Sequence, residues 1–196
     1  MVKQRTIDLR STGEFFHIYN RGVNRERIFY SDRDYEYFMK LIHAAFDPEG
    51  LSLHAYSLMP NHFHMVLRQL IPYALSDFMK SVCERHAEHV NYLQKRKGHL
   101  FEGPYTMKNF DERRHLLYMS KYVHLNPLQG HLVEKLEDWP YTSWNQYLKG
   151  EEDGLVTTKA VLGLAGGIEA YRRYLKAKTG VENEEMEFYV IDRELP

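Results

Sequence analysis

The sequence contains, at residues 51–67, the stretch LSLHAYSLMPNHFHMVL, in which two runs of strand-forming residues flank a Pro-Asn pair. The first run alternates, so the odd-numbered residues from Leu51 to Ser57 are expected on one side of a strand. The even-numbered residues from His54 to Leu58 are expected on the other side. Because a Pro-Asn pair favours a turn, the stretch predicts a β-hairpin.

The segments on either side of this hairpin continue a pattern of strands and helices. A strand is predicted at 14–19, and a helix that Ser31 or Asp32 can cap is predicted after it. Beyond the hairpin, the pattern predicts a long helix at 76–96, a weaker strand at 105–110, and a helix that begins at Asp111 and that Pro127 ends. This order predicts an α+β fold with a ferredoxin-like antiparallel sheet, helices packed on one face, and one added helix.

The charge distribution divides the chain into two parts. The formal net charge is −1, which by itself argues against a nucleic-acid-binding protein. Residues 1–130, however, carry 18 basic and 14 acidic side chains, whereas residues 131–196 carry 8 and 13. We expect one main domain at 1–148 and a C-terminal helical extension at 149–196, with short helices near 157–164 and 168–178 and an acidic tail at 182–187.

Cysteine usage and hydropathy indicate the compartment. The single cysteine, Cys83, allows no intramolecular disulfide and no CxxC metal site. The N-terminal residues do not resemble a signal peptide, and the sequence has no apolar stretch long enough to span a membrane. We therefore expect a cytoplasmic protein with no membrane partner.

The second strand of the hairpin carries the pair His62-Phe63-His64. Residues i and i+2 of a strand point to the same side, so both imidazoles face one way and Phe63 the other. Two such imidazoles can chelate one divalent cation. The alternative is a pair of hydrogen-bonded histidines that only support the sheet.

Three polar residues on the last predicted helix follow a spacing of four: Tyr118, Tyr122 and Asn126. They lie along one stripe of the helix. The Asn126 amide oxygen could be a third ligand beside two imidazoles, and a tyrosine one turn earlier could attack a phosphorus bound to the cation. The alternative is a tyrosine stripe that packs on the sheet.

Four ordered segments together resemble the single-tyrosine HUH transposases, and especially the REP-associated tyrosine transposases. They are Phe16–Gly22, Leu58–His64, Gly98–Gly103 and Tyr122–Pro127. Asp138–Ser143 also resembles the segment that follows the catalytic helix in that family. The resemblance covers roughly residues 14–148.

This resemblance implies a specific reaction and site. His62 and His64 match the metal ligands, Asn126 matches the position of the third ligand, and Tyr122 matches the nucleophile on the catalytic helix. The implied enzyme is an endonuclease and strand-joining transposase that cuts single-stranded DNA near hairpins and leaves a 5′-phosphotyrosine and a free 3′-hydroxyl. The implied cofactor is Mg²⁺ or Mn²⁺, and ligand chemistry favours Mn²⁺ because imidazole suits Mg²⁺ less well.

The sequence departs from the family pattern at two positions, and other interpretations stay open. Pro104 and Gln129 stand where the family commonly has arginine, which removes two candidate phosphate contacts.

One competing hypothesis is a domesticated member that binds a DNA or RNA hairpin without cutting it, and another is an unrelated metallohydrolase. A homodimer is compatible with the resemblance, but no residue requires one, and a monomer stays open.

Further residues complete the set of candidates. Tyr118 is an alternative nucleophile, because some HUH enzymes carry two tyrosines four residues apart. For His86 and His89, a solvated helix face is favoured over a second metal site. The candidate DNA-backbone contacts are basic residues near these segments: Arg21, Arg25, Arg27, Lys80, Arg113, Arg114 and Lys121.

Overall fold

The computed structural model describes residues 7–110, 113–150 and 154–177. Its centre is a four-stranded antiparallel sheet with the strand order β2-β3-β1-β4. The strands are β1 (Phe15–Arg21), β2 (Leu51–Met59), β3 (His62–Gln69) and β4 (Thr106–Phe110). Helices connect β1 to β2 and β3 to β4, so the predicted ferredoxin-like topology is confirmed.

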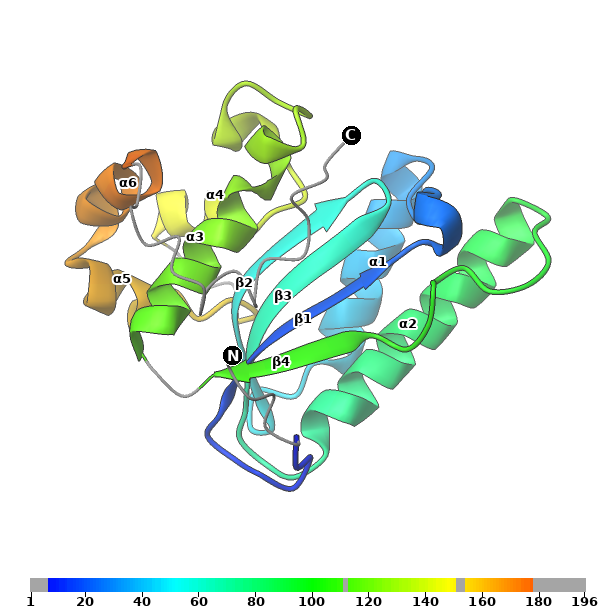
Figure 1. Ribbon diagram of the computed structural model, residues 1–196, viewed down its shortest axis with the longest axis horizontal. Coiled ribbons are helices and arrows are strands. Elements are labelled where there is room, and N and C mark those ends of the chain that lie inside the picture. Colours follow the sequence, from blue (N-terminus) through cyan, green and yellow to red (C-terminus); the bar gives the residue numbers. More distant parts are fainter. Residues whose placement is uncertain (1–6, 111–112, 151–153, 178–196) are drawn as a thin grey trace, which may run out of the picture.

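Helices cover both faces of this sheet (Figure 1). Helices α1 (Asp32–Ala45) and α2 (Ala74–Leu93) lie side by side on one face, where the ring of Phe38 contacts that of Phe63. Ser31 is the N-cap of α1, and the Asp34 carboxylate accepts hydrogen bonds from the backbone of Ser31 and Tyr30. The added helix, α3 (Arg113–Gln129), packs on the opposite face.

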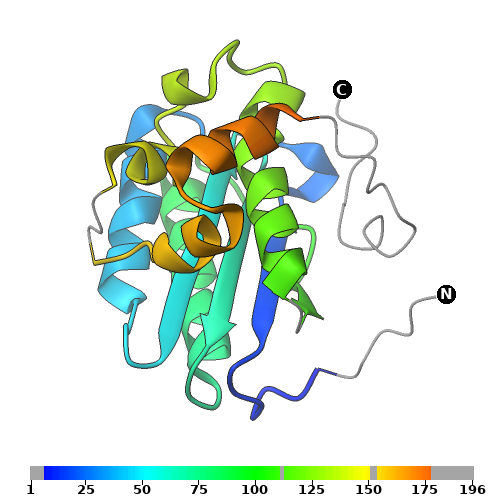
Figure 2. The ribbon, with the colours of Figure 1, turned by 90° about the vertical axis from the view of Figure 1, so that its left-hand side faces the viewer.

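Three short helices after α3 pack around it rather than on the sheet centre (Figure 2). They are α4 (Trp144–Lys149), α5 (Lys159–Ala165) and α6 (Ile168–Lys176). The last two confirm the helices expected in the C-terminal part, whereas α4 and the 3₁₀ turns Val23–Arg25 and Leu136–Asp138 were not predicted. None of the helices in the described ranges is both long and apolar enough to cross a membrane.

The strict alternation predicted for β2 is wrong in its first half. Leu53 pairs with Leu67 and Ala55 with Val66, so the register shifts between Leu53 and Ala55. A β-bulge adds one residue on one strand and reverses the faces beyond it. Leu53 therefore lies on the α1 and α2 face, whereas Ala55 lies on the α3 face with His64.

The end predicted for the last helix is also wrong. Pro127 lies inside α3, which continues to Gln129, and the Gly130 amide donates to the Asn126 carbonyl. Proline removes a backbone donor but has a helical φ, so a helix can continue for a few residues beyond it. The predicted start at Asp111 and the acidic segment 182–187 lie outside the described residues.

His86 and His89 do not form a solvated face. His86 is fully buried, and its Nε2 lies 2.8 Å from the Ile28 carbonyl oxygen. His89 stacks on Tyr37, and its Nε2 lies 3.2 Å from Asp34 Oδ1. Both histidines belong to the contact between α2, α1 and the segment before α1, which the helical periodicity of α2 alone could not reveal.

Candidate active site

The alternation of β3 brings both histidines of the His-Phe-His segment to the face that α3 covers. Phe63 contacts Phe38 of α1 on the other face. The rings of His62 and His64 lie edge to face with centroids 4.9 Å apart, and both side chains are buried. His62 Nδ1 lies 2.6 Å from the Oδ1 of Asn61, in the hairpin turn.

A third imidazole, which was not among the predicted site residues, comes from the neighbouring strand. His17 Nε2 lies 3.0 Å from His64 Nδ1, and the two rings stack with centroids 5.2 Å apart. On β1, His17 is opposite Val66 and Tyr19 is opposite His64, so both side chains share the face of His64. Alternation within 14–19 could have grouped His17 with Tyr19, but the strand pairing was needed to place them beside His64.

Helix α3 adds a tyrosine to this cluster. The Tyr122 ring lies edge-on to His64 and His17, with centroid distances of 5.4 and 5.7 Å. Asn126 is buried one turn further on, and its Nδ2 donates to the Tyr122 carbonyl oxygen, so Oδ1 is the amide atom left to accept a further contact. The structure thus brings His62, His64 and Tyr122 together, and the place of Asn126 in a ligand set stays a prediction.

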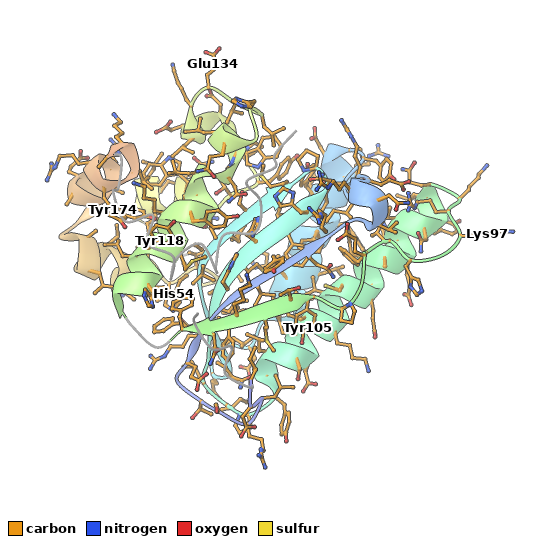
Figure 3. The ribbon with its side chains drawn as sticks, viewed as in Figure 1. His54, Lys97, Tyr105, Tyr118, Glu134 and Tyr174 are labelled. Atoms are coloured by element: carbon orange, nitrogen blue, oxygen red, sulfur yellow. The ribbon has the colours of Figure 1, made fainter. Side chains whose placement is uncertain are left out.

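Tyr118 lies at a different part of α3. Figure 3 shows Tyr118 on the side of α3 where Tyr174 of α6 is found. Burial, followed by the neighbouring Tyr118 phenol, raises the pKa of Tyr174. The two tyrosines of the predicted stripe therefore have different surroundings, and the imidazole cluster surrounds Tyr122.

A cavity of about 240 Å³ opens beside the two histidines of β3. Its walls come from the ends of β1 and β3 and from the segment that leads into β4, and they include His62, His64, Tyr19, Arg21 and Glu102. Arg21 Nε lies 3.3 Å from Glu102 Oε1, so a cation and a carboxylate face each other at this cavity. The cavity therefore opens onto both imidazoles of β3.

The electrostatic surroundings keep His64 neutral. Burial, together with the charges that His62 and His17 would carry, lowers the pKa of His64 well below its ordinary value. A neutral imidazole has a lone pair to offer a cation. Within residues 7–110, 113–150 and 154–177, no three His, Cys, Asp or Glu side chains form a cluster that could hold a metal ion. A third protein ligand from this part of the chain would therefore be of another type, such as the Asn126 amide.

The basic candidates differ in how accessible they are. Arg25 and Arg27 are exposed on the segment after β1, where Asn24 and Arg25 have positive φ values of 55° and 60°. Lys80 is exposed beside a groove of about 700 Å³ whose walls also include Glu84 and Glu88. Arg113 and Arg114 begin α3, and their side chains are outside the described part of the structure.

Lys121 is not available as a DNA-backbone contact in this structure. Its side chain is buried, and its Nζ donates to the carbonyl oxygens of Tyr174 and Ala177 at 2.7 and 2.6 Å. Burial also lowers the pKa of Lys121. The lysine caps the C-terminal end of α6, where unpaired carbonyls favour a cation. Although Lys121 is next to Tyr122 in sequence, its side chain therefore points to the α6 side of α3 and not to the imidazoles.

Fold and site together define an α+β protein whose sheet presents a His-x-His pair to a tyrosine on a covering helix. Residues 13–126, more than half of the chain, match the family described as Transposase IS200 like. The chain therefore belongs to this transposase family. None of the curated proteins matches the chain.

Two solved structures are similar to this one. A REP-associated tyrosine transposase bound to a REP hairpin has a TM-score of 0.57 and 14% identity, over 80% of this chain and 89% of that chain. This likeness shows the shared fold. A putative transposase from Deinococcus radiodurans R1 has a TM-score of 0.40 and 18% identity, over 63% of this chain and 95% of that chain.

Proposed function

We propose that this transposase cuts and rejoins single-stranded DNA near hairpins through a covalent 5′-phosphotyrosine on Tyr122, with a divalent cation as cofactor. The observation that carries the proposal is the edge-on contact of the Tyr122 ring with His64 and His17. Three elements distant in sequence contribute these rings. Membership of the transposase family supports a reaction on DNA, and the hairpin in the solved relative supports a hairpin-bearing substrate.

The side chains at the site fit a divalent cation. His62 and His64 are two nitrogen ligands on one strand face, and the low pKa of His64 keeps its imidazole neutral. The Asn126 oxygen would be the third protein ligand. A bound cation would polarise the phosphate and stabilise a phenolate. Two imidazoles favour Mn²⁺ over Mg²⁺.

In the proposed reaction, Tyr122 loses its phenolic proton and its oxygen attacks the phosphorus of a phosphodiester. The bond between phosphorus and the 3′-oxygen breaks, and that oxygen takes up a proton to give a 3′-hydroxyl. The protein then holds the 5′-phosphate as a tyrosyl ester. Attack by a 3′-hydroxyl on this ester releases Tyr122 and rejoins a strand, so no external energy source is needed.

Of the candidate basic residues whose side chains the structure describes, Arg21, Arg25 and Arg27 adjoin this site and would hold the DNA backbone. Arg21 borders the cavity, and Arg25 and Arg27 are exposed on the adjoining segment. The ion pair with Glu102 would have to open for Arg21 to bind a phosphate. Lys80 lies beside a groove whose walls include three glutamates, Glu84, Glu88 and Glu102, which favours a smaller contribution from it.

The test is a covalent-adduct assay on the full chain. Hairpin-bearing single-stranded DNA, labelled on the 3′ side of the cleavage site, is incubated with Mn²⁺ or Mg²⁺ and separated on a denaturing gel. Tyr122→Phe should abolish the adduct and leave DNA binding intact, whereas Tyr118→Phe, the matched control, should form it. If Tyr122→Phe still formed the adduct and Tyr118→Phe did not, the assignment of Tyr122 as the nucleophile would be overturned.

Two other outcomes point to the competing functions. Cleavage without an adduct would indicate a metallohydrolase. Hairpin binding with neither adduct nor cleavage would indicate a binding protein that has lost the chemistry, in keeping with the absence of arginine at Pro104 and Gln129.

A further inference from the structure

Asn61 connects the proposed metal ligand His62 to the segment that follows β1. Its Oδ1 lies 2.6 Å from His62 Nδ1, and its Nδ2 donates to the Arg25 carbonyl oxygen at 3.2 Å. Its own carbonyl oxygen accepts a hydrogen bond from the Gly22 amide at 2.8 Å. One residue of the hairpin turn therefore makes three polar contacts, of which one is to an imidazole.

The turn that carries Asn61 is itself held in place. The Pro60 carbonyl oxygen accepts hydrogen bonds from the amides of Ile28 and Phe29, at 2.9 and 3.1 Å. Gly22 is closely packed here, because a Cβ at this position would lie 2.1 Å from the Glu26 carbonyl oxygen. The carboxamide of Asn61 thus projects from a backbone that is fixed on both sides.

These contacts determine which ring nitrogen of His62 carries the proton. A carbonyl oxygen only accepts, so the atom of Asn61 that faces Arg25 must be Nδ2 and the atom that faces His62 must be Oδ1. An amide oxygen also only accepts, so His62 Nδ1 must donate. The lone pair of the neutral ring is then on Nε2, the nitrogen that does not face Asn61.

The corresponding contact of His64 does not impose a tautomer. Its Nδ1 partner is His17 Nε2, at 3.0 Å, and an imidazole nitrogen can either donate or accept. The two histidines of β3 are therefore held in different ways. Only the contact to Asn61 has a defined direction.

We propose that Asn61 is a positioning residue, which holds His62 as the Nδ1–H tautomer so that Nε2 is the nitrogen offered to a divalent cation. The proposal rests on the function proposed above and adds to it a residue that sets metal affinity without touching the metal. Hydrogen-bond partners of this kind orient a ligand and increase its basicity.

The first experiment measures the tautomer of His62 in the metal-free full chain by long-range ¹H–¹⁵N NMR. The wild type should show a protonated Nδ1, and Asn61→Leu should lose this preference. A wild-type His62 that is protonated on Nε2 would overturn the proposal. This result does not depend on whether the protein cuts DNA, so it separates the failure of this proposal from the failure of the proposed function.

The second experiment measures Mn²⁺ affinity by titration calorimetry without DNA. Asn61→Leu should weaken Mn²⁺ binding about 10- to 100-fold. Asn61→Asp keeps an acceptor for His62 and loses the donor to the Arg25 carbonyl, so it should bind Mn²⁺ at least as tightly as the wild type. A merely structural role through the Arg25 contact would weaken both variants alike, and that result would overturn the proposal.

The matched control is Asn145→Leu. Asn145 also donates from Nδ2 to a backbone carbonyl, that of Trp139 at 3.2 Å, and it lies on α4. Its replacement should leave both the His62 tautomer and Mn²⁺ affinity unchanged, and thermal unfolding monitors the fold of each variant. Equal losses of affinity in Asn145→Leu and Asn61→Leu would contradict a specific role for Asn61. A wild type that binds no Mn²⁺ would count against the proposed function as well.

Discussion

The two sides of α3 each bury a histidine, and the two surroundings differ. On the side of the sheet, His64 contacts two further imidazoles and the Tyr122 ring, and it borders a cavity. On the side of α6, His124 is enclosed, with Nδ1 at 2.9 Å from the Tyr171 hydroxyl and Nε2 at 2.8 Å from the Ser143 hydroxyl.

Burial lowers the pKa of both histidines, to about 3 for His124 and well below the ordinary value for His64. A low pKa therefore does not distinguish a functional histidine from a structural one. The hydrogen-bond partners distinguish them. Both ring nitrogens of His124 lie within hydrogen-bond distance of hydroxyl groups, whereas His64 belongs to a group of rings that borders a cavity. We expect substitutions on the sheet side to change chemistry and substitutions on the α6 side to change stability.

The largest expected effect is on the sheet side. His64→Gln should reduce the yield of covalent DNA adduct by more than about 100-fold, because even indirect partners of a metal ligand contribute 10- to 100-fold. The control is His124→Gln, assayed at a temperature at which both variants are folded. An equal loss of adduct in the two variants would show that the two sides of α3 are not functionally distinct.

On the α6 side, His124→Leu should lower the free energy of unfolding by about 1–3 kcal/mol, because the buried Tyr171 hydroxyl loses its partner. Urea unfolding measures this change. The adduct yield per folded molecule should stay at the wild-type level. A variant as stable as the wild type would mean that the contacts of His124 contribute little to the packing of α6.

Acidification should destabilise the protein through its buried histidines. In the unfolded chain, His124 takes up a proton as the pH falls below about 6.5, whereas in the folded protein its pKa is about 3. The unfolded state therefore binds more protons between these values, and stability falls by about 1.4 kcal/mol per pH unit for each such histidine. His54 and His86, with pKa values lowered by burial to about 4, act in the same direction.

Urea unfolding from pH 7 to pH 5 measures this loss of stability. In His124→Gln, the free energy of unfolding should depend less steeply on pH, with a slope that corresponds to about one proton fewer. An unchanged slope in the variant would contradict the assignment of a neutral, buried His124.

The smallest expected effect concerns Lys121. Lys121→Met should lower the free energy of unfolding by about 0.3–1 kcal/mol, because the C-terminal carbonyls of α6 lose a cation. The salt dependence of hairpin binding should not change, whereas Arg25→Gln should reduce its slope by about one. If the salt dependence of hairpin binding were reduced in Lys121→Met, Lys121 would be a DNA contact after all.

Much of the fold and part of the candidate site could be predicted from local patterns. Alternation on 62–67 placed His62 and His64 on one face, and helical spacing placed Asn126 one turn from Tyr122. Both inferences use only the geometry of a single element. Two of the errors arose where an element meets another: the bulge at Leu53–Ala55 changes the faces of β2, and His86 is buried by a segment distant in sequence. The third, the helix end predicted at Pro127, arose because a proline does not always end a helix.

By itself, the sequence determined which residues share a face of β3 or a stripe of α3, because the repeat of a strand without a bulge and the repeat of a helix are fixed by the backbone. Only the tertiary structure decided which of these faces meet. It placed His17 against His64, turned Tyr122 toward the imidazoles and Lys121 toward α6, and joined Asn61 to both His62 and Arg25. Strand register and helix packing are set by contacts between residues far apart in the chain, and no local pattern records them.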